Sequence, residues 1–325
     1  MTKVLADALV PIFAGLLLGY FAGLWRRMDN QNVRTLITFV MSFAVPCSLF
    51  MSIAQTPRAE LREQAGAALV LTIVYGVLYA LTFWWARSSQ KLGTSESADL
   101  ALTISFPNSA AVGLALLISV FGPKSLVTVA TSIALGSITV SAITLAILEA
   151  EREPSGEGLS FRHFAVSLLH SGKNPIVWAP LLGVVFSCAG LQLPSYVNRS
   201  LAVMGSASAG SALVLTGLVV SAQKFEFGSN TVVAVFLKNL LQPGLALGAA
   251  MLIHLSLDQT RYVTLISAIP CGFFGIVFGK GYNTNPKLAS SGLVASYVFG
   301  VATLAIWIVV VNRLGLKCVI EVSDR

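Results

Sequence analysis

Two apolar segments of this chain are interrupted in the same way, at corresponding places in its two halves. The first interruption is Phe-Pro-Asn-Ser at residues 106–109, and the second is Ile-Pro-Cys-Gly at residues 269–272. Proline removes a backbone donor and clashes with the preceding helical turn, so a helix breaks or kinks at each place. A membrane interior tolerates broken helix only where the freed backbone is buried in protein or lines a cavity. A simple kink is the alternative for either proline alone, but the pair indicates the binding site of a secondary transporter.

Apolar stretches long enough to span a bilayer recur along the whole chain. Of its 325 residues 55% are hydrophobic and only 11% are charged, whereas a soluble domain carries roughly 25% charged residues. The sequence therefore predicts an all-α membrane protein with about ten transmembrane helices. The predicted spans are Val4–Leu24, Val33–Ile53, Ala65–Ala86, Ala98–Phe121, Ser125–Leu148, Asn174–Gly190, Ala202–Ala222, Thr231–His254, Tyr262–Phe278 and Leu288–Val311.

The longest polar stretch, residues 149–173, divides the predicted spans into five and five. An odd number of spans in each half gives the halves opposite topology, and the interrupted span is the fourth of each. This pattern predicts an inverted repeat: residues 1–148, a loop at 149–173, and residues 174–325. The loops predicted to lie on the same side of the membrane as residues 149–173 carry eleven lysines and arginines, whereas the loops on the opposite side carry five. The positive-inside rule then places the loop in the cytoplasm.

Several classes of function are disfavoured. No catalytic motif, nucleotide-binding loop or cofactor signature is present, so we expect no enzyme and no cofactor. The net charge is +7, but the basic residues are scattered singly over the loops. This pattern is usual in membrane proteins and does not indicate nucleic-acid binding. The four cysteines have no metal-binding spacing. No acidic residue lies near the centre of a predicted span, and Asp99 lies at the end of one. The sequence therefore predicts no acidic residue that could carry a coupling ion.

Lys238 is the clear exception to the apolar spans. It lies about eight residues inside the eighth span, and Gln242 shares its helix face four residues later. A buried ammonium usually faces a partner or a water-filled cavity. We expect Lys238 either to bind an anion directly or to stabilise a helix break; the alternative is snorkelling to the headgroups or a tie to a backbone carbonyl.

The interruptions themselves offer a second feature that attracts anions. Each helix that restarts after a break presents free N–H groups and the positive end of its dipole. Two such ends near the bilayer midplane would hold a carboxylate. The side chains at 108 and 109 add donors at the first break, while cysteine and glycine hold the matching places at the second. The predicted substrate-binding residues are Pro107, Asn108, Ser109, Pro270, Cys271, Gly272, Lys238 and Gln242.

Glycines spaced by four in the first span form a smooth helix face, at Gly15, Gly19 and Gly23. Such a face lets another backbone approach closely. Two interpretations remain open: packing inside the monomer, or part of a homodimer interface.

Taken together, these features resemble the auxin efflux carrier family in its bacterial branch, over essentially the whole chain. The residues that carry the resemblance are Phe106-Pro107-Asn108, the run from Asn174-Pro175 to Pro180 and Gly183, Lys238 with Pro243, and Pro270. Within the family the chain looks most like the malonate transporters that accompany malonate decarboxylase in bacteria.

The resemblance implies a scaffold of spans 1, 2, 6 and 7 and a moving domain of spans 3–5 and 8–10, with spans 4 and 9 crossing at the site. It further implies a carrier of a small organic anion, with malonate favoured, that works by an elevator-like motion in the bacterial inner membrane. H⁺ or Na⁺ is the expected coupling ion. The alternatives are a passive facilitator of the same fold, a carrier of another carboxylate such as an auxin-like weak acid, and a receptor that binds a carboxylate without moving it.

Overall fold

The computed structural model describes residues 2–152, 175–284 and 287–323. Most of the predicted loop at 149–173 lies outside these ranges. The α-helices are α1 (Thr2–Leu24), α2 (Arg34–Phe39), α3 (Val45–Ala54), α4 (Arg58–Ser88), α5 (Thr94–Ser105), α6 (Leu114–Phe121), α7 (Leu126–Gly136), α8 (Ala142–Arg152), α10 (Pro175–Ala189), α11 (Ser195–Ser206), α12 (Ser208–Ser221), α13 (Ser229–Val235), α14 (Gln242–Leu252), α15 (Leu257–Ala268), α16 (Phe274–Tyr282) and α17 (Lys287–Ser323).

Short π-helical segments interrupt several of these helices without ending them. They are η1 (Val40–Ala44), η2 (Ser109–Gly113), η4 (Ser137–Ser141) and η5 (Phe236–Leu241), and one 3₁₀ turn, η3 (Pro123–Ser125), precedes α7. π-Helical turns are rare and frequently mark functional sites. Of these segments, η2 follows the first predicted break directly, and η5 carries Lys238.

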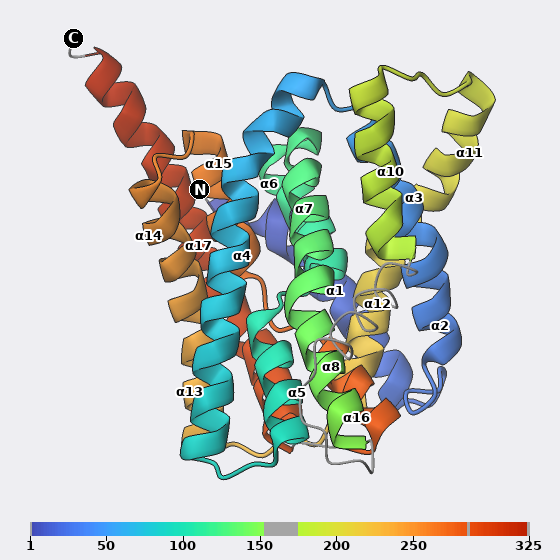
Figure 1. The fold of residues 1–325 in the computed structure, drawn as a ribbon, viewed down its shortest axis with the longest axis vertical. Helices are drawn as coiled ribbons and strands as arrows, with labels where there is room; N and C mark the ends of the chain where they lie inside the picture. Colours follow the sequence, from blue (N-terminus) through green and yellow to red (C-terminus); the bar gives the residue numbers. More distant parts are fainter. Residues whose placement is uncertain (1, 153–174, 285–286, 324–325) are drawn as a thin grey trace.

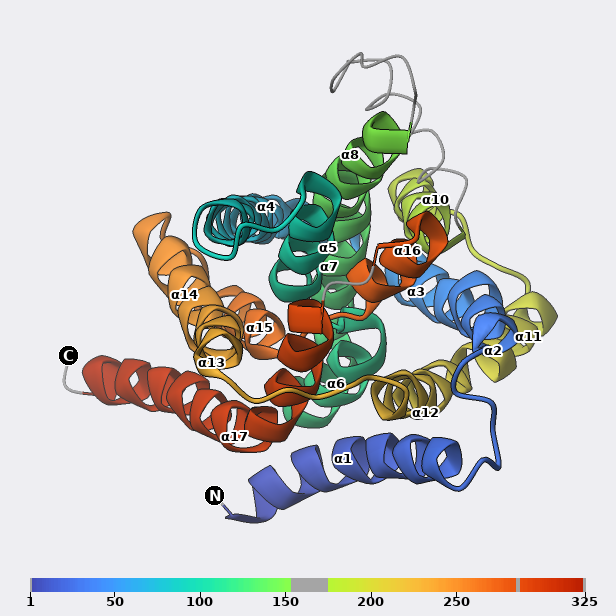
Figure 2. The same cartoon turned by 90° about the horizontal axis from the view of Figure 1, so that it is seen from below.

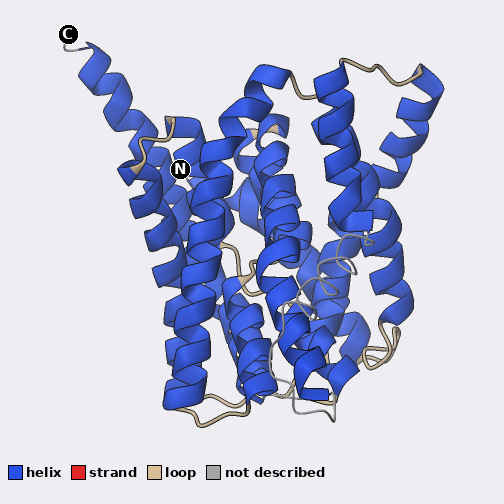
Figure 3. Cartoon of the chain, viewed as in Figure 1, coloured by secondary structure: helices blue, strands red, loops and turns tan. Residues whose placement is uncertain are grey.

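In the described part of the chain the regular elements are helices joined by loops, and one isolated bridge pairs two extended residues (Figure 3). Seven helical stretches in it are long and apolar enough to cross a membrane, and two shorter apolar helices are Ser109–Phe121 and Pro175–Ala189. Large apolar side chains also cover the outside of the bundle, among them Leu18 and Trp84, which are 68% and 66% exposed. A soluble surface would not carry them. The prediction of a helical, multi-pass membrane protein is therefore confirmed, while the ten-span inverted repeat stays a prediction.

The connections between helices gather at two opposite ends of the bundle (Figure 1). The lower end in that view holds the connections that follow α1, α4 and α12. The upper end holds those that follow α3, α6, α10 and α14. Seen from below, α5 lies in the middle of the bundle (Figure 2). Its residues from Ser95 to Ser105, with the exception of Glu96, are all buried.

The glycine face of α1 is covered by α12 of the same molecule. A Cβ atom added at Gly19 would lie 2.0 Å from the carbonyl oxygen of Val214, and one at Gly217 would lie 1.9 Å from that of Leu16. Only glycine permits such close contact between two helix backbones. Of the two interpretations of this stripe, the structure shows packing inside the monomer.

This contact makes a prediction with a matched control on the same helix. Gly217→Ala places a methyl group against the α1 backbone, and we expect it to lower stability by about 1–3 kcal/mol, as overpacked sites do. Gly210→Ala meets nothing within 4 Å, so helix propensity should make it neutral or stabilising by up to about 1 kcal/mol. Thermal unfolding of both variants in detergent measures the difference. Equal melting temperatures would contradict the packing of α1 on α12.

Candidate functional site

The two predicted breaks meet in space. Helix α5 ends at Ser105 and α15 ends at Ala268, and the extended residues that follow them form an antiparallel bridge between Pro107 and Cys271. The backbone N–H of Asn108 donates to the carbonyl oxygen of Pro270 (3.0 Å), and the N–H of Gly272 donates to that of Phe106 (2.8 Å). The backbone groups freed by the breaks therefore satisfy each other, as buried backbone must. We call residues 106–109 and 269–272 the crossing.

Gly272 is needed at the crossing because the two strands lie so close together. A Cβ atom there would lie 2.6 Å from the Phe106 carbonyl oxygen, the acceptor of the Gly272 N–H. At the other break the chain turns sharply at Asn108, whose φ of −74° and ψ of 62° describe an inverse γ-turn. The N–H of Ser109 closes that turn by donating to the Pro107 carbonyl oxygen (2.7 Å). The helix restarts at once as η2, with the Asn108 side chain accepting from the Ala111 N–H (3.4 Å).

The amide of Asn108 connects the crossing to two other helices. Its Nδ2 atom donates to the hydroxyl of Thr216 on α12 (2.9 Å) and to that of Tyr297 on α17 (2.7 Å). The Tyr297 hydroxyl in turn donates to the carbonyl oxygen of Cys271 (3.1 Å). Asn108 is 1% exposed. The sequence singled out Asn108 but not Thr216 or Tyr297, because a lone hydroxyl in an apolar span carries no signal of its partner.

Cys271 is held at the crossing by its backbone rather than by its thiol. Its N–H donates to the Ser296 hydroxyl (3.1 Å), and that hydroxyl donates to Oδ1 of Asn239 (2.7 Å). Asn239 also donates from Nδ2 to the carbonyl oxygen of Ser296 (3.0 Å). The second break is thus fixed to η5 and α17, and the two breaks differ in their side chains as predicted.

The Ser109 side chain points toward α4 and α7, which belong to the spans that the resemblance assigns to a moving domain. Its hydroxyl pairs with that of Ser132 on α7 (2.7 Å), which also pairs with the Tyr75 hydroxyl on α4 (2.7 Å). All three side chains are buried.

Lys238 and Gln242 lie behind the crossing, at the carboxyl ends of the two helices that stop there. The Lys238 Nζ atom donates to Gln242 Oε1 and to the carbonyl oxygen of Ser267, near the end of α15 (3.3 Å). Gln242 donates from Nε2 to the carbonyl oxygen of Ser105, the last residue of α5 (2.7 Å). The carboxyl end of a helix carries a partial negative charge, so a cation placed there is stabilising. Of the two roles expected for Lys238, this geometry favours the stabilisation of helix breaks.

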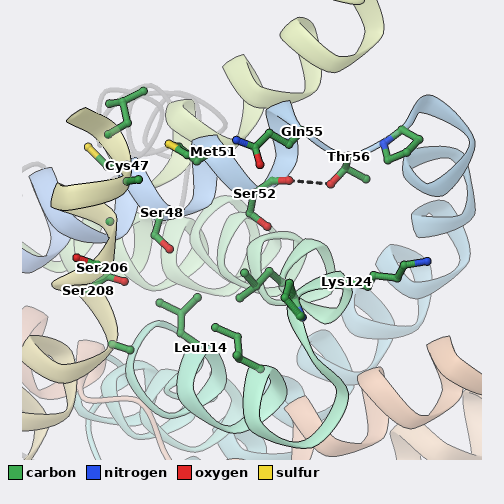
Figure 4. Close-up of a pocket in the computed structure, with 18 residues that line it drawn as sticks. Cys47, Ser48, Met51, Ser52, Gln55, Thr56, Leu114, Lys124, Ser206 and Ser208 are labelled. Carbon is green, nitrogen blue, oxygen red and sulfur yellow. Dashed lines mark hydrogen bonds between the residues drawn. The ribbon is translucent and has the colours of Figure 1, made fainter. Parts of the chain in front are cut away.

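A cavity of about 560 Å³ lies toward the upper end of the bundle, and Figure 4 shows the residues that line it. Ser48 and Ser52 on α3 face Leu114 on α6 across it, and Ser208 marks the start of α12. The charged residue among its lining residues is Lys124, on the turn between α6 and α7. Leu114 follows η2 directly, so the inner end of this cavity lies one helical turn beyond the crossing.

A second cavity, of about 410 Å³, lies toward the lower end. The start of α2, the end of α12 and the half-helix α16 line it, and its charged lining residues are Arg34 and Lys280. Each cavity thus has one restarted half-helix as a wall, α6 above and α16 below. Residues 34–54 and helix α12 contribute to both. The lining residues of the two cavities include lysine and arginine but neither aspartate nor glutamate.

Asp99 lies on the second turn of α5, consistent with its predicted place near the end of a span. Its side chain is nevertheless fully buried, which the sequence did not indicate. Helix α16 covers it: a Cβ atom added at Gly279 would lie 2.7 Å from Asp99 Oδ2. The sequence shows position along a span, but not which span ends are covered by another helix. The interior therefore does hold an acidic residue.

Comparison with known proteins places this geometry in a family. A family model described as membrane transport protein matches residues 4–308, nearly the whole chain. This chain belongs to the membrane transport protein family. The match contains the crossing, both cavities and Asp99.

Relatives of the family cover almost all of the chain. The uncharacterized transporter YfdV of Escherichia coli is 28% identical, over 93% of this chain and 96% of its own length. Auxin efflux carrier component 8 of Arabidopsis thaliana is 21% identical, over 91% and 94%. The uncharacterized transporter MJ1031 of Methanocaldococcus jannaschii is 21% identical, over 93% and 97%. The resemblance to auxin efflux carriers is confirmed, whereas the malonate branch stays a prediction.

Proposed function

We propose that this membrane transporter moves a small organic anion, with malonate as the favoured substrate, across the bacterial inner membrane by alternating access. The observation that carries the proposal is that two of the cavities, at opposite ends of the bundle, each end against a half-helix that begins at the crossing. A substrate held at the crossing would meet one cavity or the other after a modest displacement of the two half-helices.

The charge of the cavity walls supports an anion. Lys124 lines the upper cavity and Arg34 and Lys280 line the lower one, with no acidic residue among the described lining residues. A cavity whose wall carries charges of one sign raises the local concentration of a ligand of the opposite charge. The amino ends of η2 and α16 add positive dipole ends beside the crossing.

The packing of the helices supports a moving domain and a scaffold. Helix α1 packs on α12, and α10 and α11 pack on α3. In the proposal these two packed sets, α1–α3 and α10–α12, form the first group, the scaffold, against which η2 and α6 of the second group also pack. The second group contains α4–α8 and α13–α17, in which α4 packs on α5, α14 on α15, and α16 on α5. In the proposed elevator motion the second group, which contains the crossing, slides along the first.

The test is uptake of labelled malonate into proteoliposomes, with proton and sodium gradients imposed separately. We expect concentrative uptake driven by one of them. Uptake that stops at equal concentrations would identify a passive facilitator. If malonate neither enters nor competes, the substrate assignment is wrong, and auxin-like weak acids would be tested in the same assay.

A further inference from the structure

Asp99 is a buried carboxyl group without a counter-charge. Thr284 donates a hydrogen bond to its Oδ2 atom. Its Oδ1 atom has no hydrogen-bond partner among the described residues. Asp99 also forms no ion pair within the described ranges of the chain. An ionised carboxylate in such a place costs several kcal/mol unless it is paired.

Among the described residues, no titratable group near Asp99 forms an ion pair with it. On α16, Lys280 follows Gly279 and lines the lower cavity, and on α17, Lys287 lines another cavity together with Glu96. Glu96 of α5 and Tyr79 of α4 lie within electrostatic reach, and neither is a cation. On α8, Glu151 reaches the start of α5 by accepting hydrogen bonds from Ser95. On η5, Lys238 meets α5 only through Gln242, which contacts its opposite end.

The amino end of α5 offers little help either. The field of a helix end falls off within its first turn, and Asp99 lies on the second. The environment therefore favours a carboxyl group that holds a proton.

Tight packing favours a proton over a larger cation. Added Cβ atoms at Gly275 and Gly279 would lie 2.2 Å from the Asp99 carbonyl oxygen and 2.7 Å from its Oδ2 atom. Helix α16 thus rests directly on this residue. No group of three or more acidic, histidine or cysteine side chains that could hold a metal ion occurs in the described ranges. A proton needs only the carboxyl oxygen itself.

Helix α16 connects this carboxyl group to the transport route. It begins just after the crossing, and Ile276, Val277 and Lys280 line the lower cavity. Gly275 and Gly279, on the same helix, face Asp99. A charge that appears on Asp99 would draw in water or a cation at the α5–α16 contact. It would therefore disfavour the packing that the structure shows.

We propose that Asp99 binds and releases the proton that couples anion transport to the proton gradient. This inference rests on the proposed function. The carboxylate takes a proton from hydronium in the water on one side of the membrane: the carboxyl O–H bond forms as one O–H bond of hydronium breaks, leaving water. The carboxyl group releases that proton on the other side, so that the anion and the proton cross together.

The first experiment uses the full chain in proteoliposomes and compares Asp99→Asn with Asp258→Asn, a control whose side chain is 68% exposed. We expect Asp99→Asn to lose proton-driven accumulation of labelled malonate while it keeps exchange of internal for external malonate. The control should keep both. Accumulation by Asp99→Asn at the wild-type level, or wild-type uptake driven by sodium and indifferent to the proton gradient, would overturn the proposal.

The second experiment is independent of the substrate. Infrared difference spectra of the purified protein, titrated from mildly acid to alkaline pH, should contain a carboxyl C=O band that disappears as the pH rises. The band should be present in wild type and Asp258→Asn and absent from Asp99→Asn. Identical spectra for wild type and Asp99→Asn would refute protonation of Asp99. If no protein exchanges malonate but the band behaves as expected, the substrate proposal fails and the proton site stands.

Discussion

Lys238→Met is expected to destabilise the protein by about 2 kcal/mol or more and to reduce transport of a dianion and a monoanion by the same factor. Methionine keeps the length of the side chain but removes the charge that faces the carboxyl ends of α15 and α5. A hydrogen bond from a charged donor contributes roughly 1.5–3 kcal/mol, and Gln242 Oε1 would lose its partner as well.

The measurement is thermal unfolding in detergent together with uptake of malonate and of a monocarboxylate. Lys224→Met, at an exposed lysine in the connection after α12, is the matched control and should change neither. A loss confined to the dianion, with stability unchanged, would show instead that Lys238 binds the substrate directly.

Asn108→Ala is expected to abolish uptake and to lower stability by roughly 3 kcal/mol. The variant loses the hydrogen bonds to Thr216, Tyr297 and the Ala111 N–H, each worth about 1 kcal/mol net. It also removes the amide that joins the crossing to α12 and α17. Thr216→Val removes one of these bonds and should have a smaller effect on stability.

Uptake and melting temperature should be measured on the same preparations. Asn198→Ala is the control, because the Asn198 side chain accepts an exposed hydrogen bond from Gln55, the residue that follows α3. Full uptake by Asn108→Ala would remove Asn108 from the transport route. If a folded variant retains its melting temperature but loses uptake, the role of Asn108 is in transport alone.

The breaks at 106–109 and 269–272 were predictable because proline and glycine act on the local backbone. Their meeting near the midplane was expected from the paired breaks and from the resemblance, but the backbone bridge between Pro107 and Cys271, which joins distant parts of the sequence, was not. A tie from Lys238 to a backbone carbonyl was among the alternatives, but which carbonyl accepts the hydrogen bond was not predictable. Sequence shows that a buried ammonium needs partners, but the partners here are backbone carbonyls of Ser267 and, through Gln242, Ser105. Backbone atoms have no sequence signature.

The burial of Asp99 is a second feature that the sequence did not predict. Hydropathy places a residue along a helix, but burial depends on which helix packs over it. Gly275 and Gly279 provide that contact, and their small size gave no indication of the carboxyl beneath. The glycine face of α1 was ambiguous for the same reason, and the structure shows that α12 occupies it.

The bridge at the crossing also sets an order for biosynthesis. Phe106 and Asn108 enter the membrane early, but their backbone partners, Gly272 and Pro270, are translated much later. Until then an unsatisfied donor and acceptor stay inside a hydrophobic environment, which is costly. The N-terminal part of a nascent chain therefore remains incomplete on its own. Its final folding must wait for the C-terminal part, and this interval is when quality-control proteases and membrane chaperones have access to it.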